Sequence, residues 1–410
     1  MQHKIANTLT IVLFSAVLLS VIGTEALLHM GIDFPTWTGI GQKKTALEGR
    51  TYTKMPKPSL SSFQSGDFQD QCEGYLADNL PFRESALVLN ARLQGSVIST
   101  AALPLGYKAY PTFFDSDIVY NSEDGTLSDM PAQDTPELRK KLESFARNFE
   151  GLAESYPQTK FFVMSPPRAN YVDNSPLTAL VPDAIGQDDV KEILSGATRD
   201  SVVIDYPSDY ETRLKWFYRT DHHWNMDGAY EGYKAIAEAL GFGDEIVEKG
   251  GVVYESPLFY GAYARDGLFD GESEVLYDYG FDLPDYGVKI NGKEKSMDSL
   301  VHDTDKKADV KFSSRYSNRF HHEYAQIQIT NPEKHDQSKL LLVGDSFTDC
   351  IERLLASHFQ TTVVFDPRDT AGNDGTTVSE IIEAYGGFDD VVFLFNSTAL
   401  SRSDVIATTK

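Results

Sequence analysis

The sequence predicts an α/β fold in which a parallel β-sheet is flanked by helices. A series of short apolar runs with few polar breaks is typical of buried strands: residues 160–164, 202–204, 341–343, 361–365 and 391–395. Segments with helical periodicity separate these runs, and strands that alternate with helices form parallel sheets. The chain has 410 residues, of which 41% are hydrophobic and 24% charged, so it can form one large domain with an insertion or two domains.

Two segments have a clear helical pattern. Residues 137–156 place apolar side chains at intervals of three and four, namely Leu138, Leu142, Phe145, Phe149 and Leu152. Residues 227–240 predict a second helix, which ends at Gly241. The first helix leads directly into the run 160–164, as expected of a helix that packs against the sheet.

One long segment breaks the alternation of strands and helices. Residues from about 245 to 338 are acidic, aromatic and rich in turn residues, with little helical period. We interpret them as an insertion of irregular and β structure within a domain that spans residues 65–410. Such an insertion could form one wall of a substrate cleft.

The N-terminal residues 1–28 are predicted to be a transmembrane anchor. Ile5 to Thr24 carry no charged side chain, and twenty such residues form a helix of about 30 Å, the thickness of a bilayer core. Lys4 precedes this stretch and Glu25 follows it, so the positive-inside rule places the body of the protein outside the cytoplasm, at the cell membrane. A signal peptide cleaved near Ala26 is the alternative, but the apolar run is longer than usual for one. Residues 29–64 are rich in Pro, Gly, Ser, Thr and Lys and predict a linker.

The net charge of −24, from 61 acidic and 37 basic residues, limits the partners. It argues against binding nucleic acid, whose phosphates would be repelled. It also disfavours a highly anionic polymer as substrate, unless a local basic pocket exists. A neutral or mixed-charge glycan fits better.

The chain contains two cysteines, Cys72 and Cys350. An exported protein could pair them. Cys350, however, lies on the apolar side of the segment after Ser346, where a small buried thiol is more common.

The tripeptide Gly344-Asp345-Ser346 follows a predicted buried strand and opens an amphipathic segment. This order predicts a strand, a tight turn and a helix that has Asp345 as N-cap and Ser346 in its first turn. A serine there would lie beside free backbone N–H groups and the positive end of the helix dipole, which suits a nucleophile whose attack creates an oxyanion. The alternative is a capped helix with no chemical role.

The segment Asp221-His222-His223-Trp224-Asn225 supplies a carboxylate and two imidazoles. A serine nucleophile needs a base, and the base needs an orienting acceptor on its other nitrogen. Asp221 and His223 are two residues apart, so a turn can bring both side chains to one side. Imidazole and carboxylate also bind zinc or manganese, but no further ligand cluster at helical spacing is present. A second pair, His321-His322, does not reproduce this spacing.

Together the two motifs resemble the SGNH/GDSL hydrolase superfamily, in particular its acetyltransferase branch with the alginate O-acetylation proteins. The nearest resemblance is to the DHHW family, named for the tetrapeptide that stands here at Asp221–Trp224. Residues 78–83, 161–167 and 365–368 are similar to other elements of these proteins, although Asp369 replaces an expected aromatic residue. The resemblance covers roughly residues 65 to 400 and implies an SGNH-like sheet.

The motifs and the resemblance assign roles to seven residues. Ser346 is the predicted nucleophile, His223 its base, and Asp221 the group that orients His223. The N–H of Ser346 is one expected oxyanion donor. Further candidates for contacts with the substrate or the oxyanion are Gly261, Asn396, Arg368 and His222. Trp224 is expected to pack rather than react, and no metal or other cofactor is expected.

The resemblance implies an extracytoplasmic serine O-acetyltransferase that acts on a cell-envelope or secreted polysaccharide. A multipass membrane acyltransferase would then supply the acyl group. An esterase with the same three residues is the enzymatic alternative, because water can replace the sugar hydroxyl. A glycan-binding protein that has kept the fold is the non-enzymatic one.

Overall fold

The computed structural model describes residues 52–102, 104, 106–111, 117–269, 271–302, 311–321 and 324–410, together with scattered residues before 41. The chain forms two compact units, one of residues 1–116 and 265–269 and the other of residues 117–264 and 270–410. We call them the first and the second unit. The predicted domain boundaries stay predictions.

The elements that the structure describes with bounds in the first unit are α2 (Leu60–Ser65), α3 (Asp67–Asp78), α4 (Arg83–Ala102) and β1 (Tyr107–Pro111). The N–H of Thr53 donates to the Asp78 carboxylate at 2.7 Å and so ties the segment before α2 to the end of α3. Half of residues 5–24, the charge-free stretch of the predicted anchor 1–28, lies outside the described residues. No helix that the structure describes has the length and apolar character needed to cross a bilayer.

The core of the second unit is an eight-stranded mixed sheet with the order β5-β4-β13-β11-β12-β10-β8-β9. Its strands are β4 (Lys160–Met164), β5 (Ser201–Ile204), β8 (Gly287–Ile290), β9 (Lys293–Lys295), β10 (Gln326–Thr330), β11 (Lys339–Gly344), β12 (Thr361–Phe365) and β13 (Asp390–Leu394). The five strands from β5 to β12 are parallel, whereas β10 and β8 join antiparallel. The predicted parallel sheet is therefore correct for the strands that carry the motifs and wrong for the other side, where the inserted segment adds strands.

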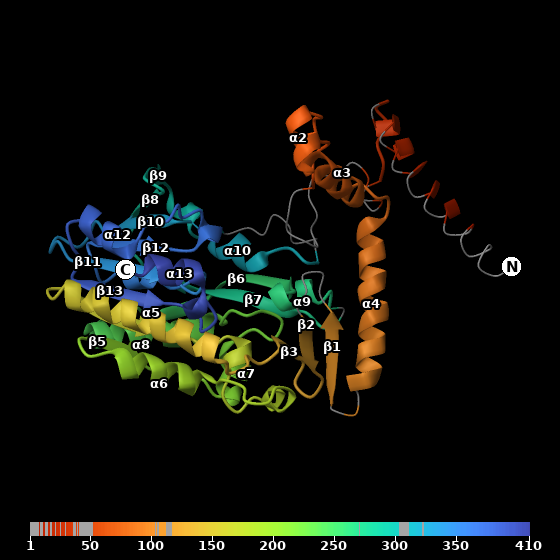
Figure 1. The fold of residues 1–410 in the computed structure, drawn as a ribbon. Coiled ribbons are helices and arrows are strands. Elements are labelled where there is room, and N and C mark those ends of the chain that lie inside the picture. Colours follow the sequence, from red (N-terminus) through yellow and green to blue (C-terminus); the bar gives the residue numbers. More distant parts are fainter. Residues whose placement is uncertain are drawn as a thin grey trace. The chain divides into compact units, whose positions relative to one another are not determined.

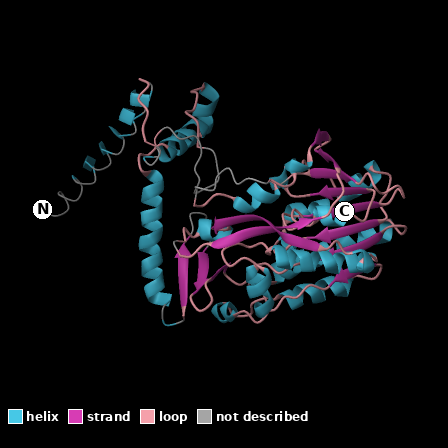
Figure 2. Ribbon diagram, turned by 180° about the vertical axis from the view of Figure 1, so that it is seen from behind, coloured by secondary structure: helices cyan, strands magenta, loops and turns pink. Residues whose placement is uncertain are grey.

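Helices pack on both faces of this sheet (Figures 1 and 2). The helices of the second unit are α5 (Pro136–Ser155), α6 (Gln187–Ala197), α7 (Tyr210–Trp216), α8 (Met226–Leu240), α9 (Ala262–Asp266), α10 (Arg315–Phe320), α11 (Glu352–Ala356), α12 (Val378–Ala384) and α13 (Ser403–Thr408), with α9 extending into the first unit. Successive side chains of each strand point to opposite faces, so Phe161 and Val163 contact the α5 side and Phe162 and Met164 the α8 side. The two apolar clusters bury the strands on both faces, as expected of parallel strands.

Local signals explain why the two predicted helices form. Helix α5 has Pro136 in its first turn, and the Thr135 side chain accepts from the N–H of Leu138. Helix α8 begins after Asn225, whose side chain accepts from two backbone N–H groups, and ends at Gly241 with φ 93°. Both predictions are confirmed to within one residue.

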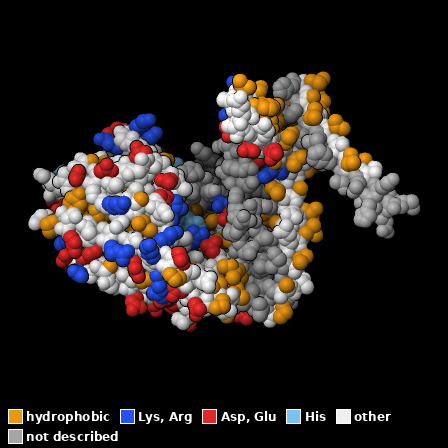
Figure 3. Space-filling model, in the orientation of Figure 1, with side chains coloured by type: hydrophobic (Ala, Val, Ile, Leu, Met, Phe, Trp, Pro, Cys, Tyr) orange, Lys and Arg blue, Asp and Glu red, His pale blue; other side chains and the backbone are white. Residues whose placement is uncertain are grey.

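Two hairpins lie outside the main sheet: β2 (Asp117–Asn121) with β3 (Thr126–Asp129), and β6 (Lys249–Phe259) with β7 (Glu274–Phe281). Acidic and basic side chains are intermixed on the face of the second unit that Figure 3 shows. The acidic excess therefore does not form one continuous patch on that face.

Candidate active site

Ser346 lies in a turn at the carboxyl end of β11. A side chain at Gly344 would meet the Leu394 carbonyl oxygen at 2.4 Å, so only glycine fits where β11 passes β13. The Asp345 carboxylate accepts from the N–H of Phe347 at 3.0 Å and from Asn396, through its N–H at 3.0 Å and its Nδ2 at 2.6 Å. Ser346 itself is partly exposed.

The prediction that a helix begins at Ser346 is wrong. The N–H of Thr348 donates to the Asp345 carbonyl at 2.9 Å, and turns continue until α11 begins at Glu352. Asp345 does bond to a following N–H, as an N-cap would, but its other oxygen is taken by Asn396 on the neighbouring strand end. The position of Ser346 is thus set by sheet packing rather than by a helix terminus.

The residues from Phe217 to Asn225 form a closed loop between α7 and α8. The N–H of Asn225 donates to the Trp216 carbonyl at 2.8 Å, and the N–H of Tyr218 donates to the His223 carbonyl at 3.2 Å. Trp224 is buried, and its Nε1 donates to Cys350 Sγ at 3.1 Å. Trp224 has the packing role that the sequence predicts.

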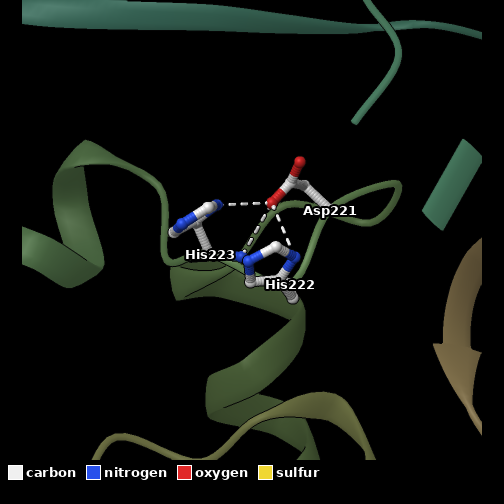
Figure 4. A group of neighbouring side chains, drawn as sticks. All are labelled: Asp221, His222 and His223. Atoms are coloured by element: carbon white, nitrogen blue, oxygen red, sulfur yellow. Dashed lines mark hydrogen bonds and ion pairs between the residues drawn. The ribbon is translucent and has the colours of Figure 1, made fainter. Parts of the chain in front are cut away.

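This loop brings Asp221, His223 and Ser346 into one hydrogen-bonded chain. His223 Nδ1 lies 2.7 Å from Asp221 Oδ1, and His223 Nε2 lies 2.7 Å from Ser346 Oγ. Figure 4 shows the Asp221 carboxylate facing both neighbouring imidazoles. This is the arrangement that the Asp-x-His spacing predicts, with the base linked to both the hydroxyl and the acceptor.

The surroundings of Asp221 keep its carboxylate ionised and fixed. Burial opposes ionisation, but the charges of His222 and His223 and the hydrogen bonds from His223 outweigh it, so the pKa of Asp221 lies well below its ordinary value. Its carboxylate also accepts from the backbone N–H groups of His223 at 2.9 Å and Ala262 at 2.6 Å. The guanidinium of Arg213 donates to the Asp221 carbonyl at 3.3 Å.

Glu274 holds the residues that precede Asp221. Its carboxylate accepts from the N–H of Arg219 at 2.7 Å and from both the N–H and the hydroxyl of Thr220 at 2.6 Å. Burial raises the pKa of Glu274, although these hydrogen bonds oppose that effect. The loop that carries Asp221 and His223 is therefore anchored to the start of β7.

Gly261 has a packing role next to this anchor. Its N–H donates to Thr220 Oγ1 at 3.1 Å, so the structure does not offer it as an oxyanion donor. An added Cβ would lie 2.3 Å from Asp221 Cβ and 2.5 Å from its Oδ2. Glycine is required because two backbone segments approach closely here.

Tyr316, which the sequence analysis missed, covers the imidazole of His223. Its ring lies against that of His223, with centroids 3.8 Å apart and planes 7° apart. Its hydroxyl donates to the Ser346 carbonyl at 3.4 Å. Burial raises the pKa of Tyr316 well above its ordinary value, and that of the neighbouring Cys350 thiol to about 12, so both stay neutral.

Cys72 and Cys350 are both free, and Cys350 is buried as predicted.

The remaining candidates occupy different surroundings. Arg368 is buried and paired with Asp366 through its Nε at 2.9 Å and through Nη2, a buried ion pair rather than a surface one. Burial raises the pKa of Asp366 to about 6 despite this pairing.

His222 lies 4.0 Å from His223 between ring centroids, and its Nδ1 is 3.6 Å from Asp221 Oδ1. His321 lies 3.3 Å from Glu352 and not at the serine, and His322 is outside the described residues.

Three residues of the site have side chains of the kind that bind metal ions. Asp221, His222 and His223 each offer an atom within 4.8 Å of the others, which a metal ion could use. The geometry favours hydrogen bonding instead, because both nitrogens of His223 are already committed, one to Asp221 and one to Ser346.

The mixed sheet and the linked serine, histidine and aspartate agree with the SGNH-like fold that the sequence resemblance implies. Residues 208–365 match the family model described as DHHW protein. This matched region contains Asp221, His223 and Ser346.

Solved structures share the fold. Bacillus cereus PatB1 with a sulfonyl adduct is 20% identical, with a TM-score of 0.55 over 72% of this chain and 99% of that one. A DHHW family protein from Eubacterium siraeum DSM 15702 is 17% identical, with a TM-score of 0.53 over 72% of this chain and 94% of that one. A search of curated proteins by sequence gives no match.

Proposed function

We propose that this protein is an extracytoplasmic serine acyltransferase that O-acetylates a polysaccharide through an acyl-serine intermediate. The observation that carries the proposal is the continuous chain from Asp221 through His223 to Ser346, with 2.7 Å at each side of the imidazole. A hydroxyl, a base and an orienting carboxylate in this order are what serine acyl transfer needs.

Each step of the reaction has a group in place. His223 Nε2 takes the hydroxyl proton while Ser346 Oγ attacks the acyl carbonyl, and the imidazolium then returns a proton to the leaving oxygen. The ionised Asp221 stabilises that imidazolium. A sugar hydroxyl next attacks the acyl-serine while His223 Nε2 takes its proton. The imidazolium then returns that proton to Ser346 Oγ as the bond between Oγ and the acyl carbon breaks, which releases the new sugar ester and restores the serine.

Two N–H groups beside Ser346 can stabilise the oxyanion. Among the hydrogen bonds between described residues, none uses the N–H of Ser346. Asn396 Nδ2 donates one hydrogen to Asp345 and has a second to offer. Removing one such donor typically costs about 10²–10³-fold in rate.

The acetyl group, the polysaccharide and the membrane-bound donor rest on the family resemblance, since the geometry alone supports acyl transfer or ester hydrolysis. The structure of Bacillus cereus PatB1 carries a sulfonyl adduct. This suggests a sulfonyl fluoride as a probe for the hydroxyl of Ser346. Anchoring by the N-terminal segment would keep the enzyme near a membrane-bound acyl donor.

The test measures turnover of a chromogenic acetyl ester by the full chain in detergent, with and without oligosaccharide acceptors. We expect acceptors to speed turnover by transfer, and Ser346→Ala and His223→Ala to abolish it equally, because nucleophile and base act as a unit. Asp221→Asn should reduce it by about 10⁴-fold. Ser155→Ala, an exposed serine on α5, is the matched control.

Other outcomes would identify the alternatives. Hydrolysis that no acceptor accelerates indicates an esterase. Activity that survives Ser346→Ala but disappears with a chelator would reject the serine mechanism in favour of a metal at Asp221, His222 and His223. Glycan binding without acylation would indicate a non-catalytic protein.

A further inference from the structure

Arg213, on helix α7, supports the loop 217–225 from within the protein. The residue is buried, with 5% of its surface exposed. Its Nη2 donates to the Asp221 carbonyl at 3.3 Å, and among the hydrogen bonds between described residues this carbonyl accepts from no other group. Asp221 is buried as well, so removal of the guanidinium would leave a buried carbonyl without a donor, which is unfavourable.

The guanidinium of Arg213 is otherwise weakly paired. Its Nη1 is buried and has no hydrogen-bond partner among the described residues, and no carboxylate of that part of the chain forms an ion pair with it. The guanidinium carbon instead lies 4.7 Å from the centre of the Phe217 ring, a cation–π contact. Arginines are rarely buried without an ion pair, because an unpaired buried charge lowers stability. The position therefore suggests that the charge serves the site beside it.

Two carboxylates act on Arg213 at longer range. Burial lowers the pKa of Arg213, whereas Tyr263, Tyr210, Glu274 and Asp221 oppose this effect, and an arginine keeps its proton in such surroundings. The side chains of Glu274 and Asp221 are only 12% and 5% exposed. Both carboxylates already accept backbone N–H groups of the loop or of its neighbour, so neither can turn towards the guanidinium without releasing them. Two buried negative charges thus share one buried positive charge.

We propose that Arg213 is a positioning residue of the acyl-transfer site, which fixes the Asp221 carbonyl and balances the charges of Asp221 and Glu274. The hydrogen bond fixes the peptide unit between Asp221 and His222, and with it the direction from which the carboxylate meets the imidazole of His223. The charge allows two carboxylates to stay ionised in buried surroundings. Arg213 is buried and acts through Asp221. This inference rests on the proposed function of the same site.

Three variants separate the hydrogen bond from the charge. Arg213→Met removes both and keeps much of the volume, Arg213→Gln keeps a donor, and Arg213→Lys keeps a donor and the charge. With a small neutral ester, the acylation rate constant of Arg213→Met should fall about ten- to a hundredfold, because a small misplacement of the orienting group is costly. The KM should not change, because the buried guanidinium does not touch the ester. Arg213→Lys should recover most of the rate and Arg213→Gln only a small part.

A raised KM with an unchanged rate constant would overturn the positioning role. Equal rates in the Gln and Lys variants would overturn the role of the charge, and this comparison decides alone if Arg213→Met does not fold. Arg147→Met, which removes an equal charge from the exposed side of α5, is the matched control and should change neither constant.

Hydrogen exchange tests the same role without catalysis. The backbone N–H groups of His223 and Ala262 donate to the Asp221 carboxylate at 2.9 and 2.6 Å. Their exchange in Arg213→Met, or in Arg213→Gln, should be about ten- to a hundredfold faster than in the wild-type chain, the range expected for one buried hydrogen bond. Exchange in Arg213→Lys should stay close to wild type. A wild-type chain that does not acylate would reject the proposed function and leave this result intact, whereas unchanged exchange in the neutral variants would overturn the role of Arg213.

Discussion

Tyr316 stacks on the imidazole of His223, with the ring centroids 3.8 Å apart and the planes nearly parallel. The two residues come from opposite sides of the site, Tyr316 from α10 in the inserted segment and His223 from the loop before α8. Asp221 and Ser346 fix the two nitrogens of the imidazole, and Tyr316 fixes the plane of its ring. The imidazole of His223 is thus held by hydrogen bonds at its edge and by an aromatic ring on its face.

Two substitutions of Tyr316 should distinguish the role of its ring from the role of its hydroxyl. Tyr316→Phe keeps the stacking and loses only long hydrogen bonds, so the acylation rate should stay within about threefold. Tyr316→Ala frees the imidazole and should lower that rate by about 10²-fold, the cost of a small misplacement. Stopped-flow acylation by a chromogenic ester measures both variants, and an unchanged rate in Tyr316→Ala would contradict this role.

Glu274→Gln should impair catalysis through the loop. The amide cannot accept all three hydrogen bonds from Arg219 and Thr220, so Asp221 and His223 lose their fixed position. We expect the acylation rate to fall about tenfold, with the KM for the ester little changed. Glu255→Gln, an exposed glutamate on β6, is the control, and equal effects of the two substitutions would show that the anchor is irrelevant.

Gly261→Ala should displace Asp221. The new Cβ would lie 2.5 Å or less from two side-chain atoms of Asp221, and neither the carboxylate nor the backbone behind it can move freely. The acylation rate should fall by at least about tenfold. Gly251→Ala, where an added Cβ meets nothing within 4 Å, should be silent. A fully active Gly261→Ala enzyme would refute the close packing.

Asp349→Asn should change how stability depends on pH. Burial raises the pKa of Asp349 well above its ordinary value, so the folded state keeps a proton that the unfolded state releases above about pH 4. Stability therefore falls as pH rises towards the folded pKa, by about 1.4 kcal/mol per pH unit for one proton. The variant lacks this loss, so its free energy of unfolding should increase relative to wild type between pH 4 and the folded pKa.

Denaturant unfolding across that pH range measures the effect, and Asp404→Asn supplies a control of opposite sign. Interaction with Arg402 and backbone N–H groups outweighs burial and lowers the pKa of Asp404 to about 2. Its stabilisation is present above about pH 4 and lost as pH falls towards 2. Parallel pH profiles for wild type and Asp349→Asn would contradict the raised pKa.

Local sequence patterns were sufficient for the five parallel strands and for helices α5 and α8. Helix α5 and strand β4 follow from apolar periodicity and capping, and Asp221 and His223 from their spacing. The strands β8, β9 and β10 were not predicted to join the sheet, because no local pattern says which edge an inserted strand will pair with. The helix at Ser346 was wrongly predicted because Asp345 bonds to Asn396, a distant residue.

The residues that support the site were missed for the same reason. Tyr316 and Glu274 reach it only through the packing of separate elements, and their surrounding sequence resembles ordinary core or surface positions. For Gly261 the sequence indicated that a glycine mattered near the site, but only the structure shows that the close approach of Asp221 requires it. Motif spacing identifies the reacting groups, whereas tertiary contacts identify what positions them.

The central claim is that Ser346 becomes acylated. Intact-mass analysis of the full chain after brief exposure to a chromogenic acetyl ester tests it most directly, followed by peptide mapping of the modified site. The account predicts a single acetyl group on the peptide that contains Ser346, absent from Ser346→Ala and nearly absent from His223→Ala. An acetyl group on another residue, or ester turnover that persists in Ser346→Ala, would contradict it.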